Sequence, residues 1–351
     1  MFKSPRAKAM FGGVLARLRR RSAANEAGAV VPGAPVTPKR LDPERILRRL
    51  EWTVIRRLDG LLQGDYRTLF RGFGIDLADL REYQAHDDVR YIDWNVTARL
   101  QVPHVREFQE DREVAAWFLL DLSGSVDFGS AETTKRTLSA DFVTVLARLL
   151  TRYGNRVGAV LYSNGTDAVI PARIGRRHVL HLLDRMLNSA VPSAKAAPAG
   201  KQTDLSELLR KAQQVIKRRS VVFVVSDFIS TPGWERALAL LARRHEVVAV
   251  RLYDPMEQAL PELGLMVMQD AETGEQLFVD MHDGGFRKRF AKLATEREQN
   301  LRTALAEAGV DCLELATDDD VAAALLRFTR LRKRRSQLAA GAGSAAMRAG
   351  V

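Results

Sequence analysis

The sequence predicts an α/β protein built on a doubly wound, mostly parallel, Rossmann-like sheet that follows an N-terminal accessory segment. From residue 114 onward, short apolar runs rich in β-branched residues alternate with longer stretches whose apolar residues recur every three or four positions. That alternation is typical of parallel strands joined by covering helices. Polar residues also follow directly after two of the apolar runs, where loops at the carboxyl ends of such strands form sites.

The composition indicates an ordinary globular chain. Of its 351 residues, 46% are hydrophobic and 28% are charged. The longest apolar runs, such as VAAWFLL (114–120), fall short of the roughly 18 residues of a membrane helix. The N-terminus lacks the pattern of a secretory signal, and the single cysteine, Cys312, cannot form an internal disulfide. We therefore expect a cytoplasmic protein with no transmembrane segment.

The net charge of +11 is concentrated at the two ends of the chain. Residues 1–50 hold 12 Lys and Arg against 3 acids, and residues 326–351 hold 7 against none. The middle, 51–325, therefore carries a net charge of −5. Basic ends of this kind are most often solvated tails, although they can also bind nucleic acid or another anionic surface.

Composition also predicts where the folded domain begins and ends. Residues 24–39 are rich in Ala, Gly and Pro without periodicity, which is typical of a linker, and the Ala- and Gly-rich C-terminus resembles a disordered tail. The predicted organisation has four parts: a basic disordered tail and linker (1–42), an accessory segment (43–113), the α/β domain (114–335) and a second disordered tail (336–351).

The strands and helices of the α/β domain can be assigned in chain order. The strand candidates are VAAWFLLD (114–121), RVGAVLYS (156–163), SVVFVVSD (220–227), HEVVAVRLY (245–253) and VDCLELA (310–316). The helix candidates are residues 131–154, 204–219, 231–244 and 286–309. Residues 265–280 predict an additional hairpin with Thr273 and Gly274 near its turn.

Three loops of this arrangement could deliver oxygen ligands to one place. Asp121, Ser123 and Ser125 follow the first strand, Thr203 precedes a helix, and Asp227 closes the third strand. Mg²⁺ takes six oxygen ligands and keeps several waters, so hydroxyls together with carboxylates suit it. We therefore expect a divalent cation, magnesium or alternatively manganese, with a coordination position for an acidic side chain of a partner protein.

Each of these residues also has a plainer explanation. A bare DxSxS pattern arises by chance in roughly one chain in ten of this length. Thr203 or Asp204 could cap a helix, because Asp204 and Glu207 have capping-box spacing, and Asp227 could be an ordinary loop acid. The adjacent Asp127 is expected to be a supporting or surface residue instead of a ligand.

Enzymatic roles for this region have weaker support. A serine nucleophile at Ser123 or Ser125 would lack a GxSxG elbow, and its base would have to be a distant histidine such as His245. Phosphoryl transfer from Asp121 in the haloacid dehalogenase manner would require Asp at position 123.

A metal site built on the two histidines of HVLH (178–181) has equally weak support, because no third ligand is close in the sequence.

The motif DxSxS followed by a Thr and then an Asp resembles the metal-ion-dependent adhesion site (MIDAS) of the von Willebrand factor A (vWA) fold. In this sequence the resemblance covers Asp121, Ser123, Ser125, Thr203 and Asp227.

Residues 70–113, FRGFGIDLADLREYQAHDDVRYIDWNVTARLQVPHVREFQEDRE, further resemble the signature of the bacterial "domain of unknown function 58" family. That signature reads like ReYxxGDDxRxIDWxxTAR, and His86 stands here where the family usually has Gly. Its alternating charges suggest either ion pairs that hold the segment on the sheet or a docking surface.

The resemblance implies a partner role. Members of this family are commonly encoded beside MoxR-type AAA+ ATPases and are thought to act with them in assembling or activating other protein complexes, in a chaperone-like manner. The chain has no Walker A sequence, so we expect no enzymatic activity of its own and any ATP hydrolysis in the partner. For this adaptor role we do not expect nucleic acid as a partner. The alternative function is that of a nucleic-acid or anionic-surface binder, which would use the basic termini.

Overall fold

We describe the protein from a computed structural model. The structure describes residues 42–55, 58, 80–84, 89, 92–106, 115–129, 133–163, 166–188, 203–262, 264–269 and 276–348. The chain divides into two compact units, of which the first comprises Met1–Gly60 and Ala115–Arg327, and the second Leu61–Val114 and Phe328–Val351. No helix in the described ranges is long and apolar enough to cross a membrane.

The first unit contains a six-stranded sheet with the order β10-β7-β6-β3-β4-β5. All neighbouring strands are parallel except β4 and β5, which are antiparallel. The strands are β3 (Ala116–Asp121), β4 (Val157–Tyr162), β5 (Thr166–Arg173), β6 (Val221–Ser226), β7 (Glu246–Tyr253) and β10 (Asp311–Ala316). The predicted doubly wound, mostly parallel sheet is thereby confirmed, and all five predicted strands are present.

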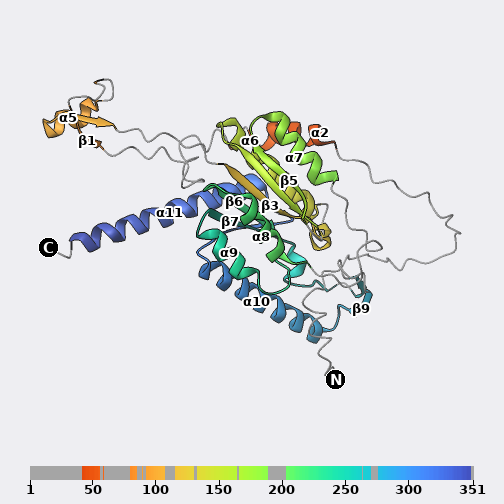
Figure 1. Cartoon of the computed structure of the whole chain (residues 1–351). Helices are drawn as coiled ribbons and strands as arrows, with labels where there is room; N and C mark the ends of the chain where they lie inside the picture. Colours follow the sequence, from red (N-terminus) through yellow and green to blue (C-terminus); the bar gives the residue numbers. More distant parts are fainter. Residues whose placement is uncertain are drawn as a thin grey trace. The chain divides into compact units, whose positions relative to one another are not determined.

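Helices cover both faces of this sheet (Figure 1). One face carries α6 (Lys135–Arg152) and α7 (Arg176–Asn188), and the other carries α8 (Leu205–Val215), α9 (Trp234–Ala242) and α10 (Gly284–Glu307). The four predicted helices are present. Short helical turns, η3 (Gly124–Asp127) and η4 (Pro255–Glu257), follow β3 and β7.

The start of α9 differs from the sequence interpretation. The sequence predicts this helix from residue 231 onward, but the helix begins at Trp234 and its N-cap is Gly233, with φ 112°, which glycine adopts without strain. The hydroxyl of Ser230 accepts a hydrogen bond from the backbone N of Leu205, at the start of α8.

Strand β5 has no counterpart among the predicted strands. Its sequence, TDAVIPAR, includes Pro171, which suits an edge strand because the ladder on one side needs no donor. The pairing with β4 shifts register between Val157 and Ala159, opposite the segment that contains this proline. An edge strand of this kind lacks the long apolar run of a central strand, so periodicity alone does not detect it.

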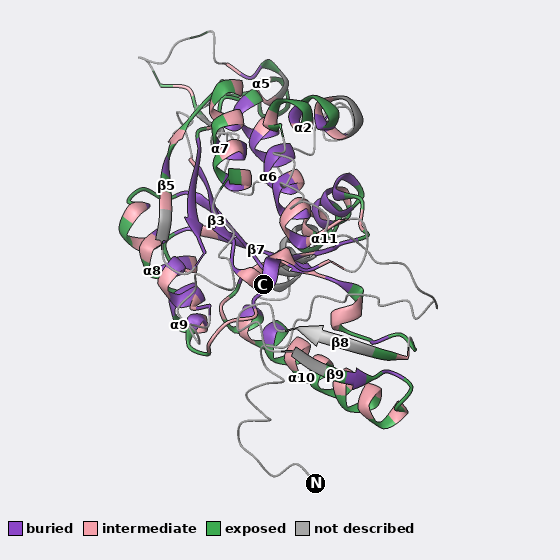
Figure 2. Cartoon of the chain, turned by 90° about the vertical axis from the view of Figure 1, so that its right-hand side faces the viewer, coloured by how far each residue is buried: buried purple, intermediate pink, exposed green. Residues whose placement is uncertain are grey.

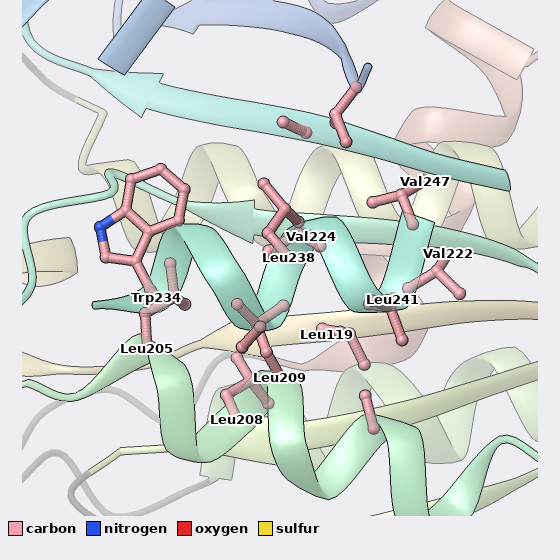
Figure 3. Close-up of a cluster of buried hydrophobic side chains, with 14 of the residues drawn as sticks. Leu119, Leu205, Leu208, Leu209, Val222, Val224, Trp234, Leu238, Leu241 and Val247 are labelled. Carbon is pink, nitrogen blue, oxygen red and sulfur yellow. The ribbon is translucent and has the colours of Figure 1, made fainter. Parts of the chain in front are cut away.

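The core below the sheet explains why these helices pack where they do. Alternate residues of a strand point to opposite faces of the sheet. On the α8–α9 face, Leu119, Val222 and Val224 of the strands form one buried cluster with Leu208 and Leu238 of the helices (Figure 3). Trp234 closes one end of the cluster against Phe228, with ring centroids 5.4 Å apart. Figure 2 shows the central strands β3 and β7 and the inward faces of the helices largely as buried.

Helix α2 (Pro43–Leu50) and the π-helical turn Glu51–Ile55 also belong to the first unit. Asp42 caps α2 by accepting a hydrogen bond from the backbone N of Glu44, and Leu47 and Leu50 are buried. The helix packs on α6 and α7. Residues 43–55, which the sequence assigns to the accessory segment, thus contribute to the helical layer on this face of the sheet.

The predicted hairpin is present as β8 (Leu265–Gln269) and β9 (Gln276–Asp280), which pair antiparallel. Its predicted turn at Thr273 and Gly274 lies outside the described residues. A separate small core of Leu260, Val279 and Met281, with Phe286 and Phe290 of α10 packed against it, fixes the hairpin.

The second unit is described in part. It contains β1 (Leu80–Glu82) paired antiparallel with β2 (His104–Arg106), and the short helix α5 (Trp94–Leu100) between them. Of the charged signature residues, Asp93 is buried and accepts a hydrogen bond from the backbone N of Val96, whereas Asp87, Asp88 and Arg90 lie outside the described residues.

Helix α11 (Val321–Arg348) extends through most of the stretch 336–351 that the sequence assigns to a disordered tail. Alanine, which dominates this stretch, is the strongest helix former, whereas the glycines that suggested disorder each oppose the helix only weakly.

The strand order places a switch point between β3 and β6. The chain continues from β3 outward to β4 and β5 on one side, and from β6 outward to β7 and β10 on the other. In open α/β sheets, ligands bind outside the carboxyl ends of the strands at such a point. We therefore expect a functional site at the loops that follow β3 and β6.

Candidate functional site

Asp121 and Ser226 end the two strands that flank the switch point. Leu120 and Val225 are the last residues that β3 and β6 pair with each other. The next residues on each strand meet through their side chains, because Ser226 Oγ donates to Asp121 Oδ2 over 2.7 Å. Ser226 Oγ also accepts from the backbone N of Phe228 at 2.9 Å. This serine, absent from the sequence prediction, links the two site loops.

Ser125 lies in η3, the short helical turn that follows β3, and Ser123 is the residue directly before that turn. The backbone N of Ser123 donates to Asp121 Oδ1 over 3.0 Å, so the strand-terminal carboxylate shapes the start of the loop. The two serine hydroxyls are 3.0 Å apart, and both side chains are buried. Among the described residues, Ser125 Oγ has this one hydrogen-bond partner, which leaves acceptor lone pairs on a buried oxygen.

Asp227 is held by a charged residue of α6. Lys135 Nζ lies 2.7 Å from Asp227 Oδ2 and 2.7 Å from Glu257 Oε1, and the lysine side chain is fully buried. The other oxygen, Asp227 Oδ1, accepts from the backbone N of Ile229 at 3.0 Å. Burial alone would lower the pKa of Lys135, but the carboxylates of Asp227 and Glu257 outweigh it and raise that pKa.

Thr203 is buried on the loop that precedes α8, and this loop is tied to the one that follows β6. The carbonyl oxygen of Thr203 accepts from the backbone N of Thr231 and from Ser230 Oγ, each at 3.0 Å. On its other side, Tyr162, which pairs with Asp121 across β3 and β4, accepts from the backbone N of Asp204 at 3.2 Å. The loop thus lies between the ends of β4 and β6.

Burial and charge act together on Asp121. The pKa of Asp121 is raised from 3.8 to about 6, first because burial disfavours the charged carboxylate and second because of the negative charge of Asp227, while hydrogen bonds from Ser226 and Ser123 lower it in part. Two carboxylates that repel each other in a buried place favour a proton or a cation there.

Asp127 and Arg136 support the loop from outside. Arg136 pairs through Nε with Asp127 Oδ1 and donates from Nη2 to the carbonyl oxygen of Leu122 over 2.9 Å. Asp127 is therefore engaged by an ion pair, as expected for a supporting residue.

Among the five predicted site residues, Asp121, Ser123 and Ser125 lie on one loop joined by side-chain contacts, and Asp227 is close enough to influence the charge of Asp121. The backbone carbonyl of Thr203 contacts Ser230 and Thr231, on the loop after β6 that also carries Asp227. Its neighbour Asp204 is the N-cap of α8, with its side chain accepting from the backbone N of Ser206. The capping role thus falls to Asp204.

The site also contains Lys135, Glu257, Ser226 and Tyr162, which sequence reasoning did not identify. Lys135 had one detectable signal: it occupies the buried stripe of α6 with Leu138 and Phe142, at spacings of three and seven residues. Glu257 had none, because the fold alone brings it to the site.

The structure places His245, the suggested base of the serine-nucleophile hypothesis, far from Ser123 and Ser125. His245 lies at the amino end of β7, immediately before Glu246, which pairs with Val221 at the start of β6. The candidate serines lie at the carboxyl ends, about 20 Å away along strands of this length. The two-histidine hypothesis also weakens, since His178 Nε2 is 2.7 Å from the carbonyl oxygen of Val157.

The chemistry of the donor set fits a hard divalent cation. It offers the carboxylates of Asp121 and Asp227 and the hydroxyls of Ser123, Ser125 and Thr203. Two oxygens bound to Mg²⁺ at right angles lie about 2.9 Å apart, close to the 3.0 Å between the two serine hydroxyls. Within the described residues no group of three or more His, Cys, Asp or Glu side chains is arranged to hold a metal, so hydroxyls would have to complete the coordination.

Comparison with known proteins identifies relatives of the chain. A family model described as "Protein of unknown function DUF58" matches residues 79–300. "Uncharacterized protein Rv1480" of Mycobacterium tuberculosis is 37% identical over 288 residues, which are 82% of this chain and 89% of that protein. "Uncharacterized protein MAV169" of Mycobacterium avium is 33% identical over 165 residues, 47% of this chain and 94% of that protein.

Among solved structures, the conserved hypothetical protein BatB from Bacteroides thetaiotaomicron is similar at 15% identity and a TM-score of 0.38, over 64% of this chain and 98% of that chain.

The mostly parallel six-stranded sheet, with helices on both faces and polar strand ends at the switch point, defines a doubly wound α/β domain. The extent of the family match and the identity to the mycobacterial relative then fix the family. The chain belongs to the DUF58 family.

Proposed function

We propose that this protein is a metal-dependent protein-interaction adaptor. Asp121, Ser123, Ser125, Thr203 and Asp227 would hold a divalent cation, magnesium or alternatively manganese. The observation that carries the proposal is the burial of two mutually repelling carboxylates beside paired serine hydroxyls at the switch point. A cation there would relieve the repulsion that raises the pKa of Asp121.

The cation would supply an electron-poor centre for an anionic ligand. Hydroxyls are neutral ligands, so a cation held by them retains more of its charge than one surrounded by carboxylates. The buried ion pair of Asp227 with Lys135 reduces the negative charge of the site further. A carboxylate from a partner protein would therefore bind favourably, and the protein would act as an adaptor with no catalytic activity of its own.

The partner we propose is a MoxR-type AAA+ ATPase, with which the chain would assemble or activate other protein complexes in the cytoplasm. The resemblance to DUF58 signatures supports this partner, and the absence of a Walker A sequence is consistent with ATP hydrolysis residing in it.

Partner capture tests the proposal. The tagged chain is incubated with the purified MoxR-type ATPase of the same organism, with Mg²⁺ or with EDTA. We expect capture with Mg²⁺, loss of capture in EDTA, and loss in Asp121→Ala with an unchanged circular dichroism spectrum. Glu44→Ala, which removes an exposed acid of α2, is the matched control and should capture normally. Capture that persists in EDTA would contradict the metal-dependent mechanism.

The second candidate, binding to nucleic acid or another anionic surface, has one structural observation in its favour. The C-terminal basic run lies on α11, where Arg330, Arg334 and Arg335 are exposed. This candidate predicts affinity for a DNA duplex that falls steeply with salt and disappears when residues 1–42 and 330–351 are removed. Salt-independent binding, or none, would reject it.

A further inference from the structure

Lys135 is the buried cation of the candidate site. It is the first residue of α6, directly after the N-cap Thr134, and its side chain is fully buried. Its ammonium group lies 2.7 Å from both Asp227 Oδ2 and Glu257 Oε1. A lysine is almost never buried unless it is paired, so these two carboxylates account for its position.

The charges around Lys135 come from four elements. Asp227 follows β6, Glu257 belongs to η4, and Asp121 ends β3 and interacts electrostatically with Asp227. On α10, the partly buried Arg297 interacts electrostatically with Glu257 and Asp227. Removing one member of a buried ionic group leaves the others uncompensated, which is costly in a medium of low dielectric constant.

The position of Lys135 gives it two effects on a cation site. Its single positive charge compensates part of the negative charge of Asp227 and Glu257 when no metal is bound, and its two contacts link the loops after β6 and β7. It also puts a fixed positive charge in contact with Asp227, a candidate ligand, where it repels an incoming divalent cation. The first effect stabilises the metal-free protein, and the second weakens metal binding.

We infer that Lys135 is a built-in counter-ion that maintains the metal-free site and sets a low intrinsic affinity for the divalent cation. This inference rests on the proposed function, because it assigns a regulating residue to the same site. Lys135 lies outside the motif DxSxS–Thr–Asp, and its positive charge weakens the binding of the metal that its neighbours would hold.

Two substitutions with opposite effects test the inference. Lys135→Met keeps the length of the side chain and removes its charge, whereas Glu257→Gln keeps the shape of the other partner and removes a negative charge. Mn²⁺ binding is measured by electron paramagnetic resonance of the free ion, and thermal unfolding is followed in EDTA and in Mg²⁺. Lys292→Met, the same change at an exposed position of α10, is the matched control.

We expect Lys135→Met to bind Mn²⁺ about tenfold more tightly than the wild type and Glu257→Gln to bind it about tenfold more weakly. In EDTA, Lys135→Met should have a lower Tm than the wild type. Adding Mg²⁺ should raise the Tm of Lys135→Met by more than it raises that of the wild type. Lys292→Met should match the wild type in both measurements.

Unchanged or weaker Mn²⁺ binding in Lys135→Met, with the wild type binding normally, would overturn this inference and leave the proposed function intact. If Lys135→Met does not fold, Mn²⁺ binding by Glu257→Gln that is unchanged or tighter than in the wild type would equally overturn the inference. If neither the wild type nor any variant binds Mn²⁺ or Mg²⁺, the proposed function fails and the inference fails with it.

Discussion

Ser220 and Ser226 lie at the two ends of β6, and both are buried, but they make different contacts. Ser220 precedes the strand, and its hydroxyl donates to the carbonyl oxygen of Arg218, two residues away. Ser226 ends the strand, and its hydroxyl donates to the carboxylate of Asp121, 105 residues away in the chain. The amino end satisfies its polar group locally, whereas the carboxyl end joins residues from separate strands.

This difference follows from the topology. At the carboxyl ends of β3 and β6 the chain leaves in opposite directions, so the loops diverge and leave space between them. Polar side chains there bond within their own loop and also to side chains of the neighbouring strand, as the contact of Ser226 with Asp121 shows. The concentration of buried charge at one end of the sheet is the physical basis of the candidate site.

The largest effect is expected from breaking the buried ion pair at the carboxyl end. Asp227→Asn leaves Lys135 with Glu257 as its one remaining carboxylate partner, so we expect a loss of about 3 kcal/mol in the free energy of unfolding in EDTA. Arg49→Ala, which removes the partly exposed pair with Asp141, should cost less than about 1 kcal/mol. Urea unfolding measures both. Equal costs would contradict a specially stabilised carboxyl end.

A second effect concerns pH. The pKa of Asp121 in the metal-free folded protein is raised to about 6, so folding favours its protonated form. The stability it contributes is complete below its ordinary pKa of 3.8 and is lost as the pH rises through about 6. The free energy of unfolding of the wild type, minus that of Asp121→Asn, should therefore fall by up to about 3 kcal/mol between about pH 4 and pH 7.

Unfolding in EDTA across this pH range measures that difference. Ser220→Ala provides the comparison at the amino end, where the corresponding difference from the wild type should not change with pH. A difference for Asp121→Asn that stays flat or rises with pH would contradict the burial and repulsion assigned to this carboxylate.

The smallest effect compares the two serines directly. Ser226→Ala removes a hydrogen bond to a carboxylate and should cost about 2 kcal/mol, whereas Ser220→Ala removes a neutral local bond and should cost about 1 kcal/mol. Chemical denaturation of the two variants in EDTA measures the costs. If Ser220→Ala proved the more destabilising, the distinction between the two ends would not hold.

The sequence predicts the parallel strands and their helices because buried strands are continuous apolar runs and covering helices repeat every three to four residues. It misses β5, whose proline and edge position weaken that signal. It singles out Asp121 and Asp227 as candidate ligands because an acid at the end of an apolar strand is unusual. It does not find Glu257, because a glutamate after a proline is typical of a surface turn, and its burial follows from the contact with Lys135.

The central claim is that the carboxyl ends of β3 and β6 bind a divalent cation, and calorimetric titration with MgCl₂ at pH 7.5 tests it most directly. We predict one Mg²⁺ bound per chain in the wild type and in Ser220→Ala, and no binding in the double variant Ser123→Ala, Ser125→Ala with its fold retained. Absence of binding in the wild type, or unchanged binding in the double variant, would contradict the claim.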